Sequence, residues 1–232
     1  MFTAFSQSAE AQAWEPAAGC TGFLTVQMEG CFVANYWRCD AAPAGYVFTA
    51  SHDENGRFSA NILDAEFNWL HTLWSDGWRE RLVHPTADPI STSNLMAQGW
   101  DAYDFELLSD GDSPDDGVTF TRVRGMDVLV GERVQIDGVE LERTYYHNVF
   151  SGPDGTVTAM GRGYQYFSPG YGLYFLGQEE WVENGEVDSW DNTPVEFVEP
   201  GEPGFGAVVP KYGCAAKPDI VPGKSAGPKQ SK

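Results

Sequence analysis

Acidic side chains that lie close together in the sequence are the first groups in this chain that could do chemistry. They form four pairs: Asp64 with Glu66, Asp101 with Asp104, Glu179 with Glu180, and Asp188 with Asp191. A glycosidase needs two carboxyl groups about 5–10 Å apart across a cleft. Because the chain has 34 acidic residues, pairs are expected in any case. Glu179-Glu180, beside Trp181 and close to Tyr174 and Phe175, is the pair that best fits a carbohydrate-active hydrolase.

Other catalytic and metal-binding motifs are missing from the sequence. The four histidines form no His-Glu-x-x-His, and there is no Gly-x-Ser-x-Gly, P-loop or Gly-x-Gly-x-x-Gly. The acidic turn with Asp110, Asp112, Asp115 and Asp116 offers oxygen ligands for calcium, but it lacks the glutamate at the twelfth position of an EF-hand. A solvated turn is the simpler interpretation. We therefore expect a non-catalytic protein with no cofactor and no bound metal.

Aromatic residues form the second candidate site. Phe67, Trp69, His71 and Leu73 alternate in the sequence, which predicts that they share one face of a strand. The candidate ligand-binding residues are Trp69, Trp74, Trp78, Tyr164, Tyr166 and Tyr174. Two interpretations stay open. These side chains fill the core of a sheet, or they line the concave face of a curved sheet and bind a lipid, an acyl chain or a sugar ring.

Strands joined by tight turns must position these side chains. Between Gly117 and Glu183, alternating apolar residues flank Asp137-Gly138 and Asp154-Gly155, and Asn184-Gly185 follows. Such dipeptides are strong hairpin signals, because the turn needs positive φ. The sequence predicts a mainly all-β fold, a curved antiparallel sheet or half-barrel meander with one short helix.

The first half of the chain continues this pattern. Residues 46–51 and 57–64 are predicted to form a hairpin around Asn55-Gly56, and residues 65–74 and 78–84 form the next one. The helix is expected over residues 90–98, with Asp88 as its cap, Pro89 at its first position and Gly99 at its end.

A series of short motifs resembles a known family. Gly131-Glu132-x-Val134, Asp137-Gly138, Asp154-Gly155 and Tyr166-Phe167-Ser168-Pro169-x-x-Gly172-Leu173 occur in this order. The order is similar to the ending of uncharacterised secreted proteobacterial proteins with the half-barrel fold of periplasmic lipoprotein carriers. The resemblance implies that fold and an apolar cavity, and it carries over no catalytic residues. It does not extend to the cysteine-rich N-terminal hairpin or the lysine-rich tail.

Four cysteines permit three disulfide pairings. If Glu29-Gly30 is a two-residue hairpin loop, Cys20 lies opposite Cys39, which leaves Cys31 for Cys214. A zinc site is the alternative, but no Cys-x-x-Cys occurs and the spacings are not typical. Two disulfides indicate an oxidising compartment.

The two ends of the chain differ from its middle. Residues 1–13 are interpreted as a leader or the end of a signal peptide, with Ala11 and Ala13 placed as a signal peptidase requires. Residues 14–199 are predicted to form a single β domain. Residues 200–232, rich in Pro, Gly and Lys, are predicted to be mostly extended or disordered. A periplasmic or secreted bacterial protein fits these features.

The charge distribution limits the partners. All five lysines follow Val209, whereas nine arginines and 33 of the 34 carboxylates precede it. So acidic a body repels nucleic acids and anionic lipid headgroups, and no apolar run is long enough to span a membrane. We expect a binding protein for an apolar or amphipathic ligand. The alternatives are the hydrolase described above and a structural module that binds another envelope protein.

Overall fold

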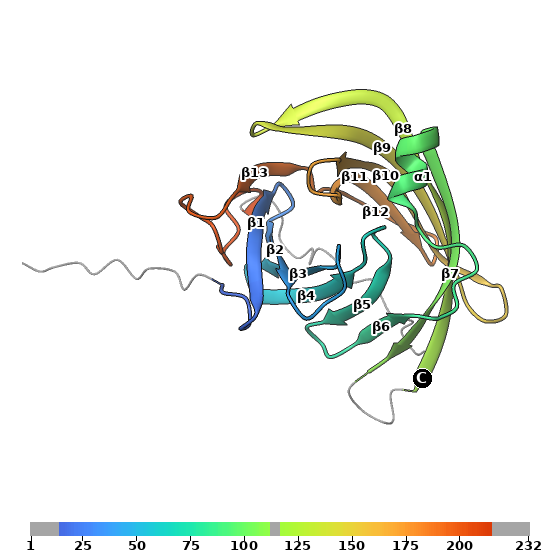
Figure 1. The fold of residues 1–232 in the computed structure, drawn as a ribbon. Coiled ribbons are helices and arrows are strands. Elements are labelled where there is room, and N and C mark those ends of the chain that lie inside the picture. The colour runs from blue at the N-terminus through green and yellow to red at the C-terminus, as the bar shows by residue number, and fades with distance from the viewer. Residues whose placement is uncertain (1–13, 112–116, 215–232) are drawn as a thin grey trace, which may run out of the picture.

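One antiparallel sheet of 13 strands forms most of the structure. The computed structural model describes residues 14–111 and 117–214. Each strand from β1 to β12 pairs with its neighbours in sequence, and β13 pairs with β1, so the sheet order is β12-β11-β10-β9-β8-β7-β6-β5-β4-β3-β2-β1-β13. Figure 1 shows the strong curvature of this meander. The predicted fold class, a curved antiparallel sheet with one short helix, is confirmed.

The elements follow one another along the chain with short connections. In order they are β1 (Cys20–Met28), β2 (Phe32–Cys39), β3 (Val47–Asp53), β4 (Gly56–Leu63), β5 (Trp69–Trp74), β6 (Arg79–Leu82), α1 (Thr92–Gln98), β7 (Trp100–Asp110), β8 (Val118–Ile136), β9 (Val139–Ser151), β10 (Val157–Ser168), β11 (Leu173–Glu183), β12 (Glu186–Asp191) and β13 (Pro194–Val198).

The two edges of the sheet lie next to each other in the chain. β12 pairs with β11, and β13 pairs with β1, yet only Asn192 and Thr193 separate them. The Asn192 amide donates to the Gly177 carbonyl at 2.8 Å, and the Glu29 amide donates to the Thr193 carbonyl at 2.9 Å. The sheet is therefore not closed by strand pairing, but the two-residue segment Asn192-Thr193 connects its two edge strands.

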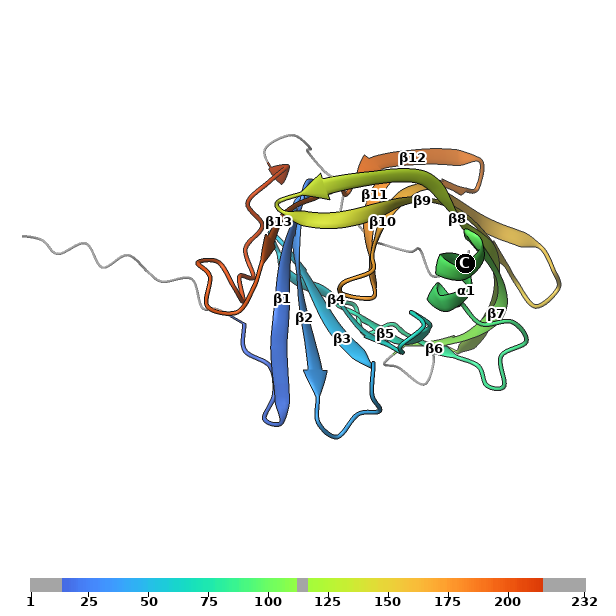
Figure 2. The same cartoon turned by 45° about the horizontal axis from the view of Figure 1, so that its top comes forward.

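The end of the β10–β11 hairpin is buried on both faces. On one face Phe175 packs against Tyr36 and Phe197, with ring centroids 5.9 Å and 5.1 Å away. On the other face Phe167 and Tyr174 pack against Leu95 of α1. Figure 2 shows this hairpin reaching into the interior between the first strands and the helix. The curved sheet thus encloses the end of the β10–β11 hairpin. Burial of large apolar side chains on both faces of the hairpin stabilises that arrangement.

The predicted turns are present, and the helix begins later than predicted. Asp137-Gly138 and Asn184-Gly185 join adjacent strands with positive φ at both residues, as a two-residue hairpin requires. Ser91, not Asp88, caps α1 and accepts a hydrogen bond from the Asn94 amide. Asp88 instead forms a β-bridge with Asp104. No helix in the described residues is long and apolar enough to cross a membrane.

The predicted disulfides are confirmed, although the loop that led to them is different. Cys20 is bonded to Cys39, and Cys31 to Cys214. Met28 pairs with Phe32, so the β1–β2 loop has three residues, with φ of 61° at Cys31. A register shift between Gly22 and Leu24 then restores the register that places Cys20 opposite Cys39.

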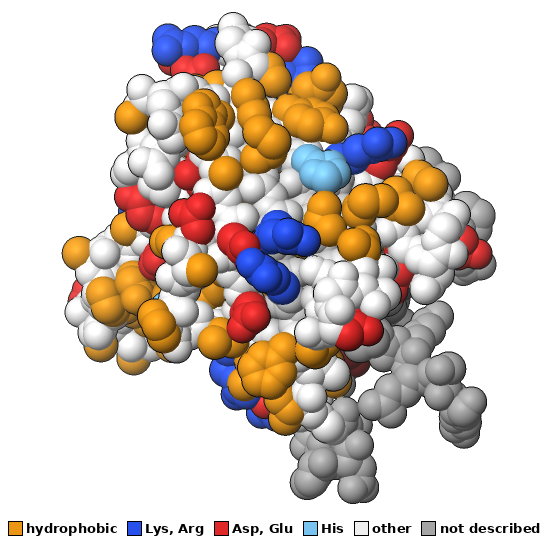
Figure 3. Space-filling view, turned by 90° about the vertical axis from the view of Figure 1, so that its right-hand side faces the viewer, with side chains coloured by type: hydrophobic (Ala, Val, Ile, Leu, Met, Phe, Trp, Pro, Cys, Tyr) orange, Lys and Arg blue, Asp and Glu red, His pale blue; other side chains and the backbone are white. Residues whose placement is uncertain are grey.

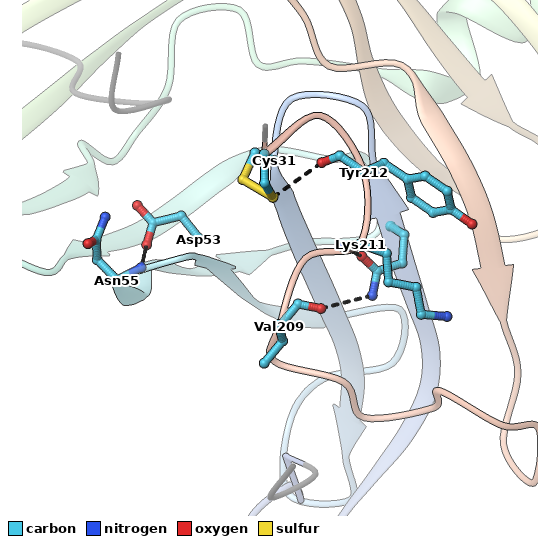
Figure 4. Close-up of a disulfide and its surroundings, with 8 residues drawn as sticks. Cys31, Asp53, Asn55, Val209, Lys211 and Tyr212 are labelled. Atoms are coloured by element: carbon cyan, nitrogen blue, oxygen red, sulfur yellow. Dashed lines mark hydrogen bonds between the residues drawn. A yellow bond between two sulfur atoms is a disulfide. The ribbon is translucent and has the colours of Figure 1, made fainter. Parts of the chain in front are cut away.

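The segment that ends at Cys214 covers one face of β1 and β2. The Gly206 amide donates to Thr25 Oγ1 and the Lys211 amide to Gln27 Oε1, each at 2.9 Å, while Asn35 Nδ2 donates to the Ala207 carbonyl at 2.9 Å. Figure 4 shows this segment beside the Cys31 disulfide. Three buried polar side chains are thereby satisfied by backbone groups.

This finding changes the prediction for the C-terminal region. Residues 200–214 form turns and the docked segment, because their backbone groups have partners on β1 and β2. The predicted leader at residues 1–13 and the rest of the tail, residues 215–232, lie outside the described residues.

Candidate functional site

The inner face of the long strands carries a row of residues that face one another across neighbouring strands. From β7 to β12 the cross-strand partners are Asp101, Asp127, Tyr146, Gly163, Glu179 and Trp190. We call these six residues the inner polar row. Asp101, Asp127, Tyr146 and Glu179 are all buried. Cross-strand partners lie about 5 Å apart on one face, so the row aligns residues from six strands, five of which contribute a side chain.

Glu179 forms one end of this network. Its carboxylate accepts hydrogen bonds from the Tyr146 hydroxyl at 3.0 Å, from Trp190 Nε1 at 2.9 Å and from Asn192 Nδ2 at 3.2 Å. Burial raises the pKa of Glu179, and these three donors act in the opposite direction. Tyr146 and Trp190 are row members themselves, so this end of the row is internally hydrogen-bonded.

Asp127 and Asp101 form the other end. Asp127 Oδ1 accepts from Gln165 Nε2 at 3.0 Å. Burial, followed by the negative charge of Asp101, raises the pKa of Asp127 to about 7. Asp101 Oδ2 accepts from the Ser91 amide at 2.8 Å, and burial also raises the pKa of this carboxyl group. Two carboxyl groups on adjacent strands thus share a poorly solvated region.

Glycine residues on the inner face let aromatic side chains approach the backbone of the sheet closely. A Cβ at Gly125 would come within 2.1 Å of Asn148 Oδ1 and within 2.6 Å of the Tyr103 ring. Because that space is open, the Tyr103 hydroxyl can donate to Asn148 Oδ1 at 2.6 Å. At Gly161 a Cβ would likewise come within 3.1 Å of the Trp181 ring.

The hydroxyl of Tyr174 is buried without a hydrogen-bond partner among the described residues. The side chain is 6% exposed, and its ring packs against Phe67 and Phe167 with centroids 4.9 Å and 5.0 Å away. Burial raises the pKa of Tyr174, and the negative charges of Asp127, Asp101 and Glu66 raise it further. The hydroxyl therefore lies near the carboxyl groups of Asp101 and Asp127. A buried hydroxyl without a partner is costly.

Apolar side chains continue the inner face beside the polar row. Phe105, Val123 and Phe150 are cross-strand partners on β7, β8 and β9. Trp69 packs edge-on against Phe105, with ring centroids 5.5 Å apart, and Phe150 lies 4.9 Å from Trp181. Trp69 and Phe150 are only partly buried. This part of the inner face is therefore not completely covered by protein.

The six predicted ligand-binding residues do not form a single site. Trp69 and Tyr174 lie on the inner face as described. Trp74 donates from Nε1 to Glu80 Oε2 at 3.2 Å, and Trp78 ends the turn that follows β5. Tyr166 packs at the border of the core that includes Phe175, on the side of β10 opposite Phe167.

Tyr164 belongs to the outer face of the sheet. It is 36% exposed, and the guanidinium carbon of Arg143 lies 3.9 Å from its ring centroid. The same face carries the ion pairs Arg162–Glu180 and Arg122–Asp104. Figure 3, which looks onto the side of the molecule around β7, shows charged and apolar side chains mixed over the surface. Tyr164 therefore cannot contribute to an inner binding site.

The predicted acidic pairs do not face each other across a cleft. Glu179 is buried on the inner face, whereas its neighbour Glu180 pairs with Arg162 on the outer face. Asp101 and Asp104 are separated in the same way, because Asp104 pairs with Arg122. Asp64, Glu66 and Asp191 hold turns or the start of α1 through hydrogen bonds. Asp64 accepts from the Glu66 amide, and Asp191 accepts from the Thr193 amide. Glu66 accepts from the hydroxyl groups of Ser91 and Thr92 and from the Ser93 amide.

Potential metal ligands are already engaged. In the described part of the chain, the one close group of such side chains is Cys31, Glu54 and Cys214. Its two sulfur atoms form a disulfide, so they are not thiolate ligands. Asp110 of the predicted acidic turn is paired with Arg79 and Arg81. The other three aspartates of that turn, Asp112, Asp115 and Asp116, lie outside the described residues.

Comparison of the chain with models of protein families, with curated proteins and with solved structures found no match. The assignment of the inner polar row as a candidate site is therefore supported by its geometry alone. Of its members, only Asp101 and Glu179 were singled out in the sequence, and both for pairs that the structure separates. The available signal was an acidic residue in alternation with apolar ones, as with Asp101 beside Tyr103, Phe105 and Leu107.

Proposed function

We propose that this chain is a non-catalytic protein of the bacterial envelope or the secreted fraction that binds an apolar or amphipathic ligand on the inner face of its sheet. The observation that carries the proposal is the partial exposure of Trp69 and Phe150 on that face, beside the polar row. Large apolar side chains that remain accessible on a concave surface are typical of small-molecule sites. The two disulfides are consistent with an oxidising compartment.

The hydrolase hypothesis has weaker support. Asp101 and Asp127 are cross-strand partners about 5 Å apart, but both are buried, so they do not face each other across an open cleft. Asp127 and Glu179, on β8 and β11, are three strands apart, so their backbones are separated by about 14 Å. Tyr146 on β9 lies between their strands, and its hydroxyl donates to Glu179 Oε1. A glycosidase needs its carboxyl groups about 5–10 Å apart with the substrate between them.

Native mass spectrometry of protein recovered from an oxidising compartment tests the proposal. Spectra are recorded before and after mild organic extraction. We expect a lipid-sized adduct that extraction removes, while both disulfides stay intact. A bare mass from every preparation, together with no binding of decanol added afterwards, would refute the proposal.

Two neighbouring residues on β9 provide matched variants for this test. Phe150 faces inward against Trp181, whereas Val149 pairs with the exposed Met160 and faces outward. We expect Phe150→Ala to weaken decanol binding and Val149→Ala to leave it unchanged. Near-UV circular dichroism and disulfide mapping confirm that each variant is folded. Equal binding by both variants would place the ligand elsewhere.

A further inference from the structure

We propose that the inner polar row binds the cationic head of the ligand, a protonated primary amine, with Asp127, Asp101 and the Tyr174 hydroxyl as its acceptors. This inference rests on the proposed binding function and names the chemical class of the ligand. Three observations carry it: unpaired buried carboxyl groups, a hydroxyl without a partner, and the spacing of the acidic groups.

The three buried carboxyl groups of the row have no cationic partner among the described residues. Asp101, Asp127 and Glu179 are 1%, 3% and 8% exposed, and none of them forms an ion pair with a described residue. None of the nine arginines pairs with these three carboxyl groups in the described part of the chain, although Arg122 and Arg162 pair with carboxylates on the outer face. A buried carboxylate without a counter-charge is costly, so a cation entering this region would be stabilised.

The Tyr174 hydroxyl marks where a ligand group would sit. Among the described residues nothing accepts from it or donates to it, although the side chain is buried. The nearby charges that raise its pKa are, in order, those of Asp127, Asp101 and Glu66. Glu66 is already occupied, because it accepts from Ser91, Thr92 and Ser93 at the start of α1. Asp127 accepts from Gln165 Nε2, and Asp101 accepts from the Ser91 amide and Asn94 Nδ2. A carboxylate has about four lone-pair sites, so both groups can accept from a ligand as well.

The spacing favours an ammonium group over a metal ion. The three carboxyl groups of the row do not form a cluster with oxygens all within 4.8 Å of one another, since among the described residues the only group of three or more potential ligands at this distance is Cys31, Glu54 and Cys214. A metal ion needs its oxygen ligands at about 2–2.6 Å. A primary ammonium has three N–H donors that reach out by about 2.8 Å each, so it can bridge two separate carboxylates and a hydroxyl oxygen.

The surroundings suit an apolar tail on that amine. Tyr174 packs against Phe67 and Phe167, and Phe67 also packs against the cluster that contains Phe105. Trp69 and Phe150 border the same cluster and are partly exposed. A chain extending from the ammonium group would therefore run along apolar side chains on the inner face.

Three ligands with the same tail test the head group. Decylamine, decanol and decanoate are titrated below their micelle concentrations and followed by calorimetry and native mass spectrometry. We expect decylamine to bind at least about tenfold more tightly than decanol, and decanoate to bind least. If decanol or decanoate binds as well as decylamine, the head assignment is wrong and the binding function stands. If none of the three binds, both proposals fail.

Variants separate the row from general electrostatics. We expect Asp127→Asn to lower decylamine affinity about tenfold or more, and Tyr174→Phe to lower it about threefold to tenfold, with decanol unaffected. Asp188→Asn, a change of the same kind on the exposed strand β12, should leave decylamine affinity unchanged. An equal loss with Asp188→Asn would mean that decylamine is held only by the overall negative charge, and the inference would be overturned.

Discussion

The buried carboxyl group of Asp127 should make the stability of this protein fall as the pH rises. Its pKa lies near 3.8 in the unfolded chain and about 7 in the folded protein. Between these values the unfolded chain has lost its proton while the folded protein retains it. The contribution of the Asp127 carboxyl group to the free energy of unfolding is therefore fully present below about pH 4 and is lost as the pH rises through about 7.

The expected size follows from the pKa difference. A difference of roughly three pH units corresponds to about 4 kcal/mol, at about 1.4 kcal/mol per unit. In Asp127→Asn the side chain no longer titrates, yet its amide oxygen can still accept from Gln165 Nε2, which now donates to Asp127 Oδ1 at 3.0 Å. The unfolding free energy of the original chain minus that of the variant should thus decrease by about 4 kcal/mol from pH 4 to pH 8.

Urea unfolding at several pH values, with the disulfides intact, measures this difference. Burial raises the pKa of other carboxyl groups as well, Glu179 among them, but these groups are common to both chains and their contributions cancel in the subtraction. Asp188→Asn is the control, since Asp188 is exposed on β12, and its difference should stay flat. Parallel pH curves for the original chain and Asp127→Asn would refute the conclusion that the pKa of Asp127 is raised in the folded protein.

Two further predictions concern the positions that hold the sheet in shape. Replacing Cys31 and Cys214 together with serine should lower the unfolding free energy by about 5 kcal/mol, because their bond closes a loop with a sequence separation of 183; urea unfolding under non-reducing conditions measures this, and a loss below about 1 kcal/mol would contradict it. Gly125→Ala should lower stability by about 2–3 kcal/mol, because its Cβ would lie 2.1 Å from Asn148 Oδ1. Gly170→Ala is the matched control, since its nearest contact is 3.9 Å away, and similar thermal shifts for the two alanine variants would contradict the close packing at Gly125.

Turns were predictable from the sequence because their chemistry is local. Asp137-Gly138 and Asn184-Gly185 adopt positive φ that few residue pairs tolerate, so the residue types alone identify the hairpins. The end of α1 was predictable for the same reason, since Gly99 adopts φ of 86°. The start of α1 was not, because Asp88 is drawn into a bridge with Asp104 on β7, a contact distant in sequence.

The disulfide prediction was correct although its stated basis was wrong. A two-residue loop was assumed, but Met28 pairs with Phe32 around a three-residue loop. The irregularity between Gly22 and Leu24 shifts the register back by one residue, so Cys20 still faces Cys39. The extra residue in the β1–β2 loop and the bulge between Gly22 and Leu24 cancel each other's effect on the register. Neither is marked in the sequence by a pattern as strong as Asn-Gly.

In β5, a β-bulge interrupts the alternation of side chains between the two faces of the sheet. Trp69 and His71 were predicted to share a face, but the register shifts between Ile62 and Leu63, opposite these residues. Trp69 therefore packs inward against Phe105, while His71 lies near Arg81 on the outer face, where burial and then the charge of Arg81 lower its pKa. Alternation predicts faces only within an uninterrupted ladder.

The inner polar row could not be predicted from sequence spacing. Its members come from six strands, and their alignment depends on five independent strand registers. An error of one residue in any register would move the members on one side of that error to the outer face. What the sequence does contain is an anomaly, namely an acidic residue in alternation with apolar ones, as with Asp101 beside Tyr103, Phe105 and Leu107 on β7.

That anomaly is also the strongest reason to connect the row with function. Removing carboxyl groups from water without a counter-charge lowers stability, and a well-packed apolar core would avoid this cost. Proteins keep such locally unfavourable residues mainly where binding or catalysis depends on them. At pH 8 the carboxyl group of Asp127 is ionised at a cost to folding, and an ammonium ligand would offset that cost. Decylamine should therefore raise the melting temperature of the original chain at pH 8 more than that of Asp127→Asn. Equal shifts would show that the buried charge is unrelated to the ligand.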